Sequence, residues 1–244
     1  MTAIALLPAR PHVAAASALL SQVAFAHAPA AFASSFGAED MVLLDLIARE
    51  AMPIRVFTLD TGRLPQETHD LIDRARARYG MAIEIFAPRF EAVEAFVGQH
   101  GTNAFYASIA LREQCCSIRK REPLERALDG AHAWITGLRR AQGVTRHDVP
   151  IREFDAAHRL PKINPLAHWS DEEVWQYLRE NAVPWNALHD RGYPSIGCAP
   201  CTRAVQPGED ARAGRWWWED PDSKECGLHR RPVAGPASLA GARV

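Results

Sequence analysis

The chain has 244 residues and a mass of 27.0 kDa, its residues are nearly half apolar, and its formal net charge is −1. A chain of this length and composition can bury the core of one α/β domain. The balance of charges excludes the global field with which proteins attract nucleic acid or a membrane surface, so we expect neither partner and expect any anion site to be local.

The N-terminal segment, residues 1–27, is apolar and rich in alanine. It lacks a basic start before a continuous apolar run, and Pro8, Arg10 and Pro11 interrupt it, which is not typical of a secretory signal. We therefore expect a helical segment packed on the core. No stretch approaches the roughly 20 apolar residues that span a bilayer, and we expect a cytoplasmic protein, because structural disulfides are rare there.

From residue 28 onward, short apolar runs alternate with amphipathic ones. A helix is predicted over MVLLDLIAREA, and another from Pro65 to Tyr79, with proline near its first turn and Gly80 beyond its end. Strands are predicted in the segments AAFASSFGAED, IRVFTLDTG, MAIEIFAP and AHAWITGL. This alternation is typical of the α/β class with a doubly wound, mostly parallel sheet.

The later part of the chain has a different character. Ser170 and Glu173 have the spacing of a capping box and predict the start of a helix that Pro184 closes. The segments that follow are rich in glycine, proline and charge and are expected to be loops. We predict a single domain over residues 1–229 and a disordered tail over 230–244, which has little with which to build a core.

The turn after the first predicted strand is a candidate phosphate site. In doubly wound sheets, ligands lie beyond the carboxyl ends of the strands, where a strand-to-helix turn presents backbone N–H groups to anions. Ser34 and Ser35 add hydroxyl donors there, and Gly37 permits close approach of the backbone. Asp60 and Gly62 end the next strand, so both turns would line one nucleotide crevice; the alternative is an ordinary structural turn.

Five cysteines require an explanation in a reducing compartment. Cys115 and Cys116 are adjacent, so their side chains diverge and converge poorly on one small ion. Zinc sites prefer paired cysteines two to four residues apart. An iron–sulfur cluster has separate iron corners and is held by four cysteines, which Cys198 and Cys201 complete. Zinc, a redox disulfide and buried structural cysteine remain as alternatives.

The fifth cysteine, Cys226, stands apart from these pairs near the end of the predicted domain. Cations raise the thiolate fraction of a neighbouring cysteine and with it the nucleophilicity. Lys224 and His229 are close in sequence, although Glu225 opposes them. A reactive role and an incidental one are both open on these grounds.

Four arginines occur where loops are expected to face the crevice. Guanidinium groups bind phosphate and sulfate oxygens in bidentate fashion, so together they would suit a multiply charged anion. They are Arg139, Arg140, Arg212 and Arg215. Three consecutive tryptophans, residues 216–218, are too apolar to be left in water and predict either a lid or a protein-docking patch.

Eight motifs match those of the assimilatory sulfonucleotide reductases in the same order, namely SSFGAED, LDTGRLPQET, QCCSIRK, WITGLRR, KINPL, YPSIGCAPCTR, GRWWWED and ECGLH. From about Ser34 to His229 the sequence closely resembles the iron–sulfur-containing adenylyl-sulfate (APS) reductases among them. The resemblance implies a fold of the adenine-nucleotide α-hydrolase, or PP-loop, type.

The resemblance also implies a two-step reaction of sulfate assimilation. The thiolate of Cys226 attacks the sulfur of APS, releasing AMP and leaving an S-sulfocysteine, and thioredoxin or a glutaredoxin-like reductant then frees sulfite. Cys115, Cys116, Cys198 and Cys201 would hold a [4Fe–4S] cluster.

The same resemblance assigns residues to the substrate. Ser34, Ser35 and Gly37 would form the phosphate-side loop, and Leu59 would lie near the adenine. Lys120, with the cluster, would position and polarise the phosphosulfate. The remaining implied contacts to the nucleotide and the closing tail are Arg139, Arg140, Arg212, Arg215 and His229.

Three alternatives stay open in the sequence. Relatives of this fold that cleave ATP carry a Ser-Gly-Gly-x-Asp-Ser turn, whereas Phe36 takes a glycine place here, so ATP hydrolysis is disfavoured. A 3′-phosphoadenylyl-sulfate (PAPS) reductase, or a dual APS/PAPS reductase, would use the same mechanism. A non-catalytic metal-binding redox sensor is an alternative of another class. The resemblance also suggests a homo-oligomer.

Overall fold

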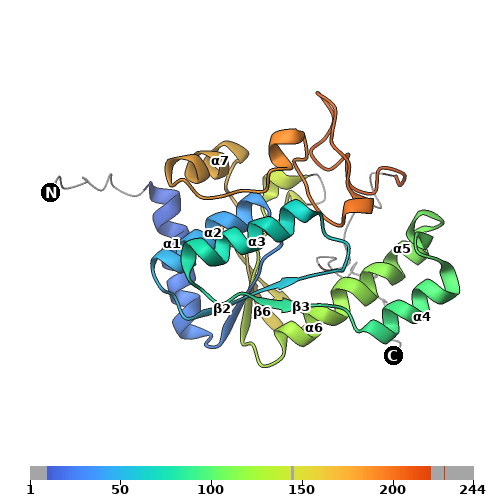
Figure 1. The fold of residues 1–244 in the computed structure, drawn as a ribbon. Coiled ribbons are helices and arrows are strands. Elements are labelled where there is room, and N and C mark those ends of the chain that lie inside the picture. The colour runs from blue at the N-terminus through green and yellow to red at the C-terminus, as the bar shows by residue number, and fades with distance from the viewer. Residues whose placement is uncertain (1–9, 144–145, 221–227, 229–244) are drawn as a thin grey trace, which may run out of the picture.

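The computed structural model describes residues 10–143, 146–220 and 228. Figure 1 shows an α/β fold in which a central twisted sheet is flanked by helices. The helices are α1 (Pro11–Ala26), α2 (Ala38–Arg49), α3 (Gln66–Tyr79), α4 (Phe90–His100), α5 (Ile109–Cys116), α6 (Glu122–Leu128) and α7 (Asp171–Glu180). The strands are β1 (Ala30–Ala33), β2 (Ile54–Leu59), β3 (Glu84–Phe86), β4 (Ala133–Ile135), β5 (Arg152–Asp155) and β6 (Leu160–Ile163).

Within the described residues the sheet has the strand order β3-β2-β1-β4-β6-β5. All neighbouring pairs are parallel except β5 and β6, which form an antiparallel hairpin at one edge. The order reverses between β1 and β4, and such a switch point is where doubly wound sheets bind ligands at their carboxyl ends. The predicted fold class is therefore confirmed.

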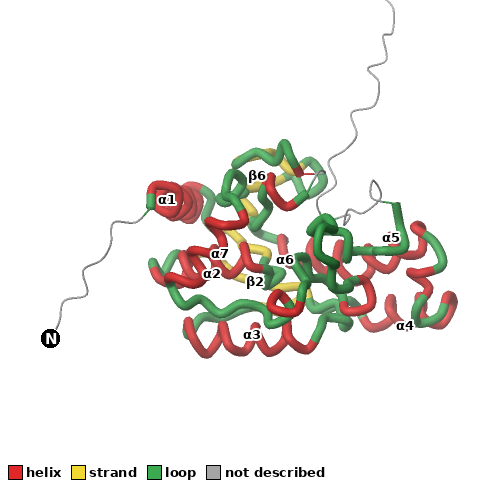
Figure 2. The backbone as a smooth tube through the Cα atoms, turned by 90° about the horizontal axis from the view of Figure 1, so that it is seen from above, coloured by secondary structure: helices red, strands yellow, loops and turns green. Residues whose placement is uncertain are grey.

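Two hydrophobic layers cover the two faces of the sheet. Alternate side chains of β1 point to opposite faces: Ala30 and Phe32 join the larger core with α1, α2, α3 and α7, whereas Ala31 joins the smaller core with α6. This alternation follows from the period of two in a strand. Figure 2 shows α4 and α5 on the opposite side of the molecule from α1.

The predicted helix boundaries are largely confirmed. Pro65 immediately precedes α3, and Gly80 ends it in the left-handed region at φ +60°. Ser170 and Glu173 form the expected capping box at α7, through hydrogen bonds of 2.8 and 3.1 Å. The helix ends at Glu180, four residues before Pro184, so proline does not terminate it directly.

The N-terminal helix packs on the larger core as expected, although the structure describes it only from residue 10 onward. The β5–β6 hairpin was not predicted. Among the described residues, no helix is both long and apolar enough to cross a membrane. The predicted disordered tail over 230–244 lies outside the described residues.

Candidate active site

The turn between β1 and α2 is built around Phe36. Its backbone lies in the left-handed region at φ +60°, its ring is buried in the larger core, and its N–H donates to Ser34 Oγ at 3.2 Å. Gly37 then caps α2 without a side-chain hydrogen bond. The buried ring therefore anchors a left-handed turn conformation that glycine usually adopts. With Gly37 at the N-cap, the start of α2 has no side-chain cap.

Asp40 ties this turn together from the first turn of α2. Its Oδ2 accepts hydrogen bonds from Ser35 N at 2.6 Å and Ser35 Oγ at 2.7 Å. Burial raises the pKa of Asp40 to about 6, although the Ser35 hydrogen bonds oppose the shift. A Cβ on Gly137 would lie 2.3 Å from Asp40 Oδ1, so the segment after β4 needs glycine to approach α2 this closely.

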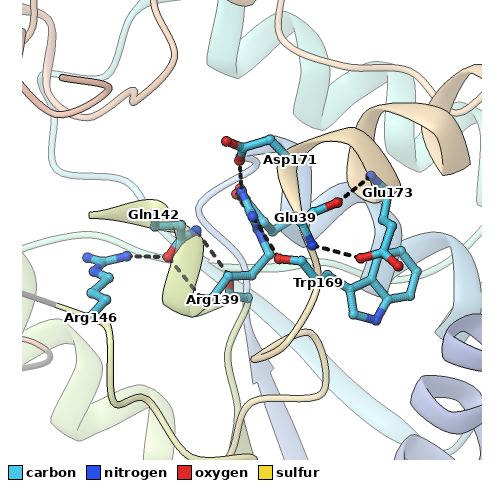
Figure 3. Close-up of polar contacts among 9 residues, drawn as sticks. Glu39, Arg139, Gln142, Arg146, Trp169, Asp171 and Glu173 are labelled. Atoms are coloured by element: carbon cyan, nitrogen blue, oxygen red, sulfur yellow. Dashed lines mark hydrogen bonds and ion pairs between the residues drawn. The ribbon is translucent and has the colours of Figure 1, made fainter. Parts of the chain in front are cut away.

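Arg139 joins three parts of the fold at the edge of the site, as Figure 3 shows. Its guanidinium donates to Glu39 Oε1 at 2.6 and 2.9 Å, to the Trp169 carbonyl at 3.0 Å, and to Asp171 at the start of α7. Burial would raise the pKa of Glu39, but the opposing charge and hydrogen bonds of Arg139 lower it overall. Two carboxylates thus balance the charge of Arg139.

A cavity of about 690 Å³ opens at the carboxyl ends of the central strands. This volume is typical of small-molecule sites. Most of the predicted substrate-binding residues line it, namely Ser34, Ser35, Gly37, Leu59, Lys120, Arg139, Arg212 and Arg215. The turn after β1 and loops from the C-terminal half therefore line one cavity.

Three described residues that were predicted to face the crevice do not appear in that lining, namely Asp60, Gly62 and Arg140. Arg140 is exposed, and its Nε donates to the Val149 carbonyl at 2.8 Å, outside the cavity wall. His229 lies outside the described residues, as does Cys226. Arg146, which the sequence analysis missed, lines the cavity and donates from Nη1 to Gln142 Oε1. Arg146 lies on a loop six residues after Arg140, and no motif or spacing in the sequence predicts that it lines the cavity.

Arg215 is held by the loop that leads to Cys198. Its Nη1 donates to the Ile196 carbonyl at 3.2 Å, and its guanidinium carbon lies 4.7 Å from the centroid of the Trp216 ring. A Cβ on Gly197 would lie 2.3 Å from Arg215 Nη2. Gly197 therefore makes room for the guanidinium between the cavity and the tryptophan.

The four cysteines line a second, small cavity. Cys115 and Cys116 end α5, which continues directly into a π-helical turn over Ser117–Arg121. Cys198 precedes a 3₁₀ turn and Cys201 ends it. Such π-helical turns are frequent at functional sites. All four residues are thiols rather than halves of a disulfide.

The surroundings of the thiols combine burial with positive charge. Burial raises the pKa of Cys115, with Arg119 opposing, and raises the pKa of Cys201 to about 12, with Lys120 and Arg215 opposing. Thr61 Oγ1 lies 3.2 Å from Cys198 Sγ, and Arg119 Nη1 donates to the Thr61 carbonyl at 2.7 Å. Thiolates in this cavity would face several cations.

The chemistry of this donor set can be tested against single ions and clusters. In the described part of the chain, no three His, Cys, Asp or Glu residues are arranged to bind one metal ion. The four thiols nevertheless line one cavity with Arg63, Arg112, Arg119 and Lys120. A donor set of four thiols with cations close by fits an anionic iron–sulfur cluster, which four cysteines hold.

The tryptophan run closes this second cavity. Trp216 is buried between two guanidinium groups, with Arg112 at 5.0 Å and Arg215 at 4.7 Å from its ring centroid. It packs with Phe105, Cys198 and Cys201 in one cluster. Trp217 is exposed. Within the run, one tryptophan therefore packs inward and another faces solvent.

Comparison with known proteins identifies the family of the chain. A model of the phosphoadenosine phosphosulfate reductase domain matches residues 29–204. The adenosine 5′-phosphosulfate reductase of Allochromatium vinosum is 58% identical over 221 residues, covering 91% of this chain and 86% of that protein. The chain belongs to the APS/PAPS reductase family. This is a family of oxidoreductases that act on a sulfur group.

Solved structures place the family fold in a wider class. The PAPS reductase from Candida auris, in a phosphate complex, has a TM-score of 0.67 at 30% identity and covers 78% of this chain and 90% of its own. An FMN adenylyltransferase variant from Candida glabrata has a TM-score of 0.56 at 16% identity, covering 81% and 66%. The second likeness shows the fold alone, which is the predicted PP-loop type.

Proposed function

We propose that this chain reduces APS to sulfite and AMP in sulfate assimilation, with thioredoxin or a glutaredoxin-like protein as reductant. One observation carries the proposal: Lys120 lines both the large cavity at the strand ends and the small cavity of the four thiols. A substrate anion in the first cavity would therefore meet a cation that also faces the second.

The lining of the large cavity suits a nucleotide with a charged end. Phe57, Leu59 and Trp134 provide apolar wall against which an adenine could pack. Six lysine and arginine side chains line the same cavity, namely Lys120, Arg139, Arg146, Arg179, Arg212 and Arg215. Bidentate guanidinium contacts favour phosphate and sulfate oxygens. In this proposal Arg139 fixes the cavity wall, because Glu39 and Asp171 already balance its charge.

We propose Cys226 as the nucleophile. Its thiolate would attack the sulfur of APS, forming an S–S bond while the bond from sulfur to the phosphate oxygen breaks and AMP leaves with that electron pair. The oxygens around the sulfur are anionic, so clustered cations are needed before a thiolate can approach. Leu228, two residues after Cys226 in the sequence, lines the large cavity, which supports this assignment.

The second step needs two electrons from a dithiol. One thiolate of the reductant attacks Cys226 Sγ in the S-sulfocysteine and releases sulfite, leaving a mixed disulfide. The second thiol of the reductant then displaces Cys226 as a thiolate and leaves the reductant as a disulfide. Sulfur passes from the oxidation level of sulfate to that of sulfite, so the electrons balance.

We propose that Cys115, Cys116, Cys198 and Cys201 hold a [4Fe–4S] cluster. When bound, such a cluster would supply a compact anionic centre whose charge neighbouring cations balance. The residues of the chain around it are Arg63, Arg112, Arg119 and Lys120. In this proposal Arg63, Arg112 and Arg119 orient the cysteines, and Lys120 lies at the border of the two cavities. We also propose a cytoplasmic location, where cysteines stay reduced and available as cluster ligands.

The proposal is tested by separating metal content from turnover. Anaerobically purified wild type should contain about four irons and four sulfides per chain, and it should release AMP from APS in a single turnover without reductant. The variant Cys226→Ser should keep its iron but release neither AMP nor sulfite, whereas Cys201→Ser should lose iron. Normal AMP release by Cys226→Ser would contradict the proposed nucleophile.

The same variant, Cys226→Ser, distinguishes the enzyme from a non-catalytic redox sensor, because the behaviour of a sensor would not depend on Cys226.

Whether the enzyme tolerates a 3′-phosphate on its substrate is a separate question within the family. Comparison of kcat/KM for APS and PAPS distinguishes an APS reductase from a PAPS or dual reductase. We propose APS as the preferred substrate because the curated relatives with high identity are named for it.

A further inference from the structure

An exposed apolar surface lies beside the four-thiol cavity. Tyr106 is 43% exposed, Ile109 is 45% exposed and Trp217 is 39% exposed. Tyr106 ends the 3₁₀ turn Ala104–Tyr106, and Ile109 is the first residue of α5. Trp217 is the middle residue of the tryptophan run. We call these three residues the aromatic rim. Exposed apolar groups gathered on one face often mark a protein-binding site.

Tyr106 and Trp217 of the rim are held by contacts to each other, to Pro200 and to Trp218. Tyr106 donates from its hydroxyl to the Pro200 carbonyl at 2.7 Å, between the two cysteines of the 3₁₀ turn. Its ring lies 4.5 Å from the Trp218 ring and 6.2 Å from the Trp217 ring, measured between centroids. Trp217 and Trp218 are edge to face at 4.8 Å. Rings ordered in this way lose little entropy on binding a partner.

The position of the rim relates it to the proposed nucleophile. Trp218 and Leu228 both pack against the buried cluster of Phe105, Cys198, Cys201 and Trp216. Cys226 falls between Trp218 and Leu228 in the sequence. Two described residues that flank Cys226 in the sequence therefore pack against this cluster, and one of them, Trp218, also contacts Tyr106 of the rim.

We propose that the aromatic rim is the docking surface for the protein dithiol that reduces the S-sulfocysteine. This inference rests on the proposed function. The rim does not line the large cavity, so it is not a wall for the nucleotide. A partner of this chemistry must bring a thiol to Cys226 after AMP has left. It would need an apolar surface around that thiol, to match a rim that is aromatic and aliphatic.

The chemistry at the rim is the second step only. The thiolate of the docked protein forms an S–S bond with Cys226 Sγ as the bond to the SO₃ group breaks and sulfite leaves with the electron pair. The partner's second thiol then closes its own disulfide and returns the Cys226 thiolate. The rim contributes affinity for the partner and takes no part in the bond changes.

The test compares two reductants in the full-length enzyme with its native metal content. The variants are Trp217→Ser and Ile109→Ser, with Phe25→Ser as a matched control, because Phe25 is 79% exposed on α1, across the molecule from α5. We expect the KM for thioredoxin to rise about tenfold or more in the rim variants, as for loss of an interface anchor. Sulfite release driven by dithiothreitol should stay at the wild-type rate, and Phe25→Ser should match wild type with both reductants.

The outcomes separate this inference from the proposed function. Wild-type KM for thioredoxin in both rim variants would overturn it, as would an equal slowing with dithiothreitol. If the KM for thioredoxin rises only because an oligomer dissociates, as sedimentation would show, the rim is an interface between copies of the chain. That outcome would also overturn the inference. Absence of AMP release by wild type in a single turnover would instead contradict the proposed function.

Discussion

Arg112 and Glu219 form a bidentate ion pair that joins the helix of the adjacent cysteines to the loop after the tryptophan run. Arg112 Nε and Nη2 donate to the two Glu219 oxygens at 2.9 and 2.8 Å, and the side chains are 1% and 3% exposed. The Arg112 guanidinium also lies over the Trp216 ring. The pair thus fixes the segment that leads toward Cys226 against α5.

Glu219→Ala should destabilise the fold strongly, because it leaves the Arg112 charge buried without its main counter-ion. Breaking one side of such a pair costs about 3–5 kcal/mol. Chemical denaturation measures the change in the free energy of unfolding. The control is Glu209→Ala, which breaks a more exposed bidentate contact to Arg203 and should have a much smaller effect. Equal effects would contradict the special role of the buried pair.

Gly137→Ala should disturb the wall of the large cavity. The new Cβ would lie 2.3 Å from Asp40 Oδ1 and 3.1 Å from Glu39 Cβ, so the segment after β4 must move away from α2. Overpacking of this kind costs about 1–3 kcal/mol, and we expect the KM for APS to rise with it. Gly98→Ala is the control: it sits in α4 with open space around it. It should instead stabilise the fold by up to about 1 kcal/mol.

Asp40 should make the fold less stable as the pH rises. Its folded pKa is raised from 3.8 to about 6, so the folded state binds the proton more tightly than the unfolded state does. The cost of ionisation is absent below about pH 4, appears as pH rises through the folded pKa, and reaches about 3 kcal/mol above it.

Asp40→Asn measures this cost. Relative to the variant, wild type should lose about 1–2 kcal/mol of unfolding free energy between pH 5 and pH 8. Any constant effect of the amide on the Ser35 hydrogen bonds cancels in that comparison. Parallel pH profiles for the two proteins, or a wild type that gains stability relative to the variant, would show that Asp40 has no raised pKa.

Arg146 and Arg140 offer a paired test of the cation site. Arg146→Ala removes a guanidinium from the cavity lining and should raise the KM for APS roughly tenfold or more, the value of a hydrogen bond to a charged group. Arg140→Ala should leave that KM within about twofold of wild type, because its guanidinium is exposed and bonded to the Val149 carbonyl. Steady-state kinetics would contradict the assignment if Arg140→Ala had the larger effect.

Local pattern was enough to predict most of the fold. The segments containing β1 to β4 were recognised from apolar runs, and the start of α7 from Ser170 and Glu173, because these signals depend on neighbours in the chain. The β5–β6 hairpin was missed. β5 reads Arg-Glu-Phe-Asp, whose charges hide the strand, and its pairing with β6 depends on the edge of a sheet already formed by β4.

The candidate site was predicted less evenly. Arg139 and Arg140 are adjacent and indistinguishable in sequence, yet one is buried between carboxylates from α2 and α7 and the other faces solvent. Arg146 carried no local signal at all. The burial of Arg139 depends on Glu39 and Asp171, which are 100 and 32 positions away along the chain, and a single sequence does not show such contacts.

The sequence by itself determined the α/β class, the turn after β1 as a candidate anion site, and the two cysteine pairs as a candidate four-sulfur site. Each follows from the type and spacing of nearby residues. Only the tertiary structure decided that the cysteine pairs share one cavity, that Lys120 borders both cavities, and that Arg112 binds Glu219. The physical reason is that these contacts form between distant segments once the sheet and its two hydrophobic layers bring them together.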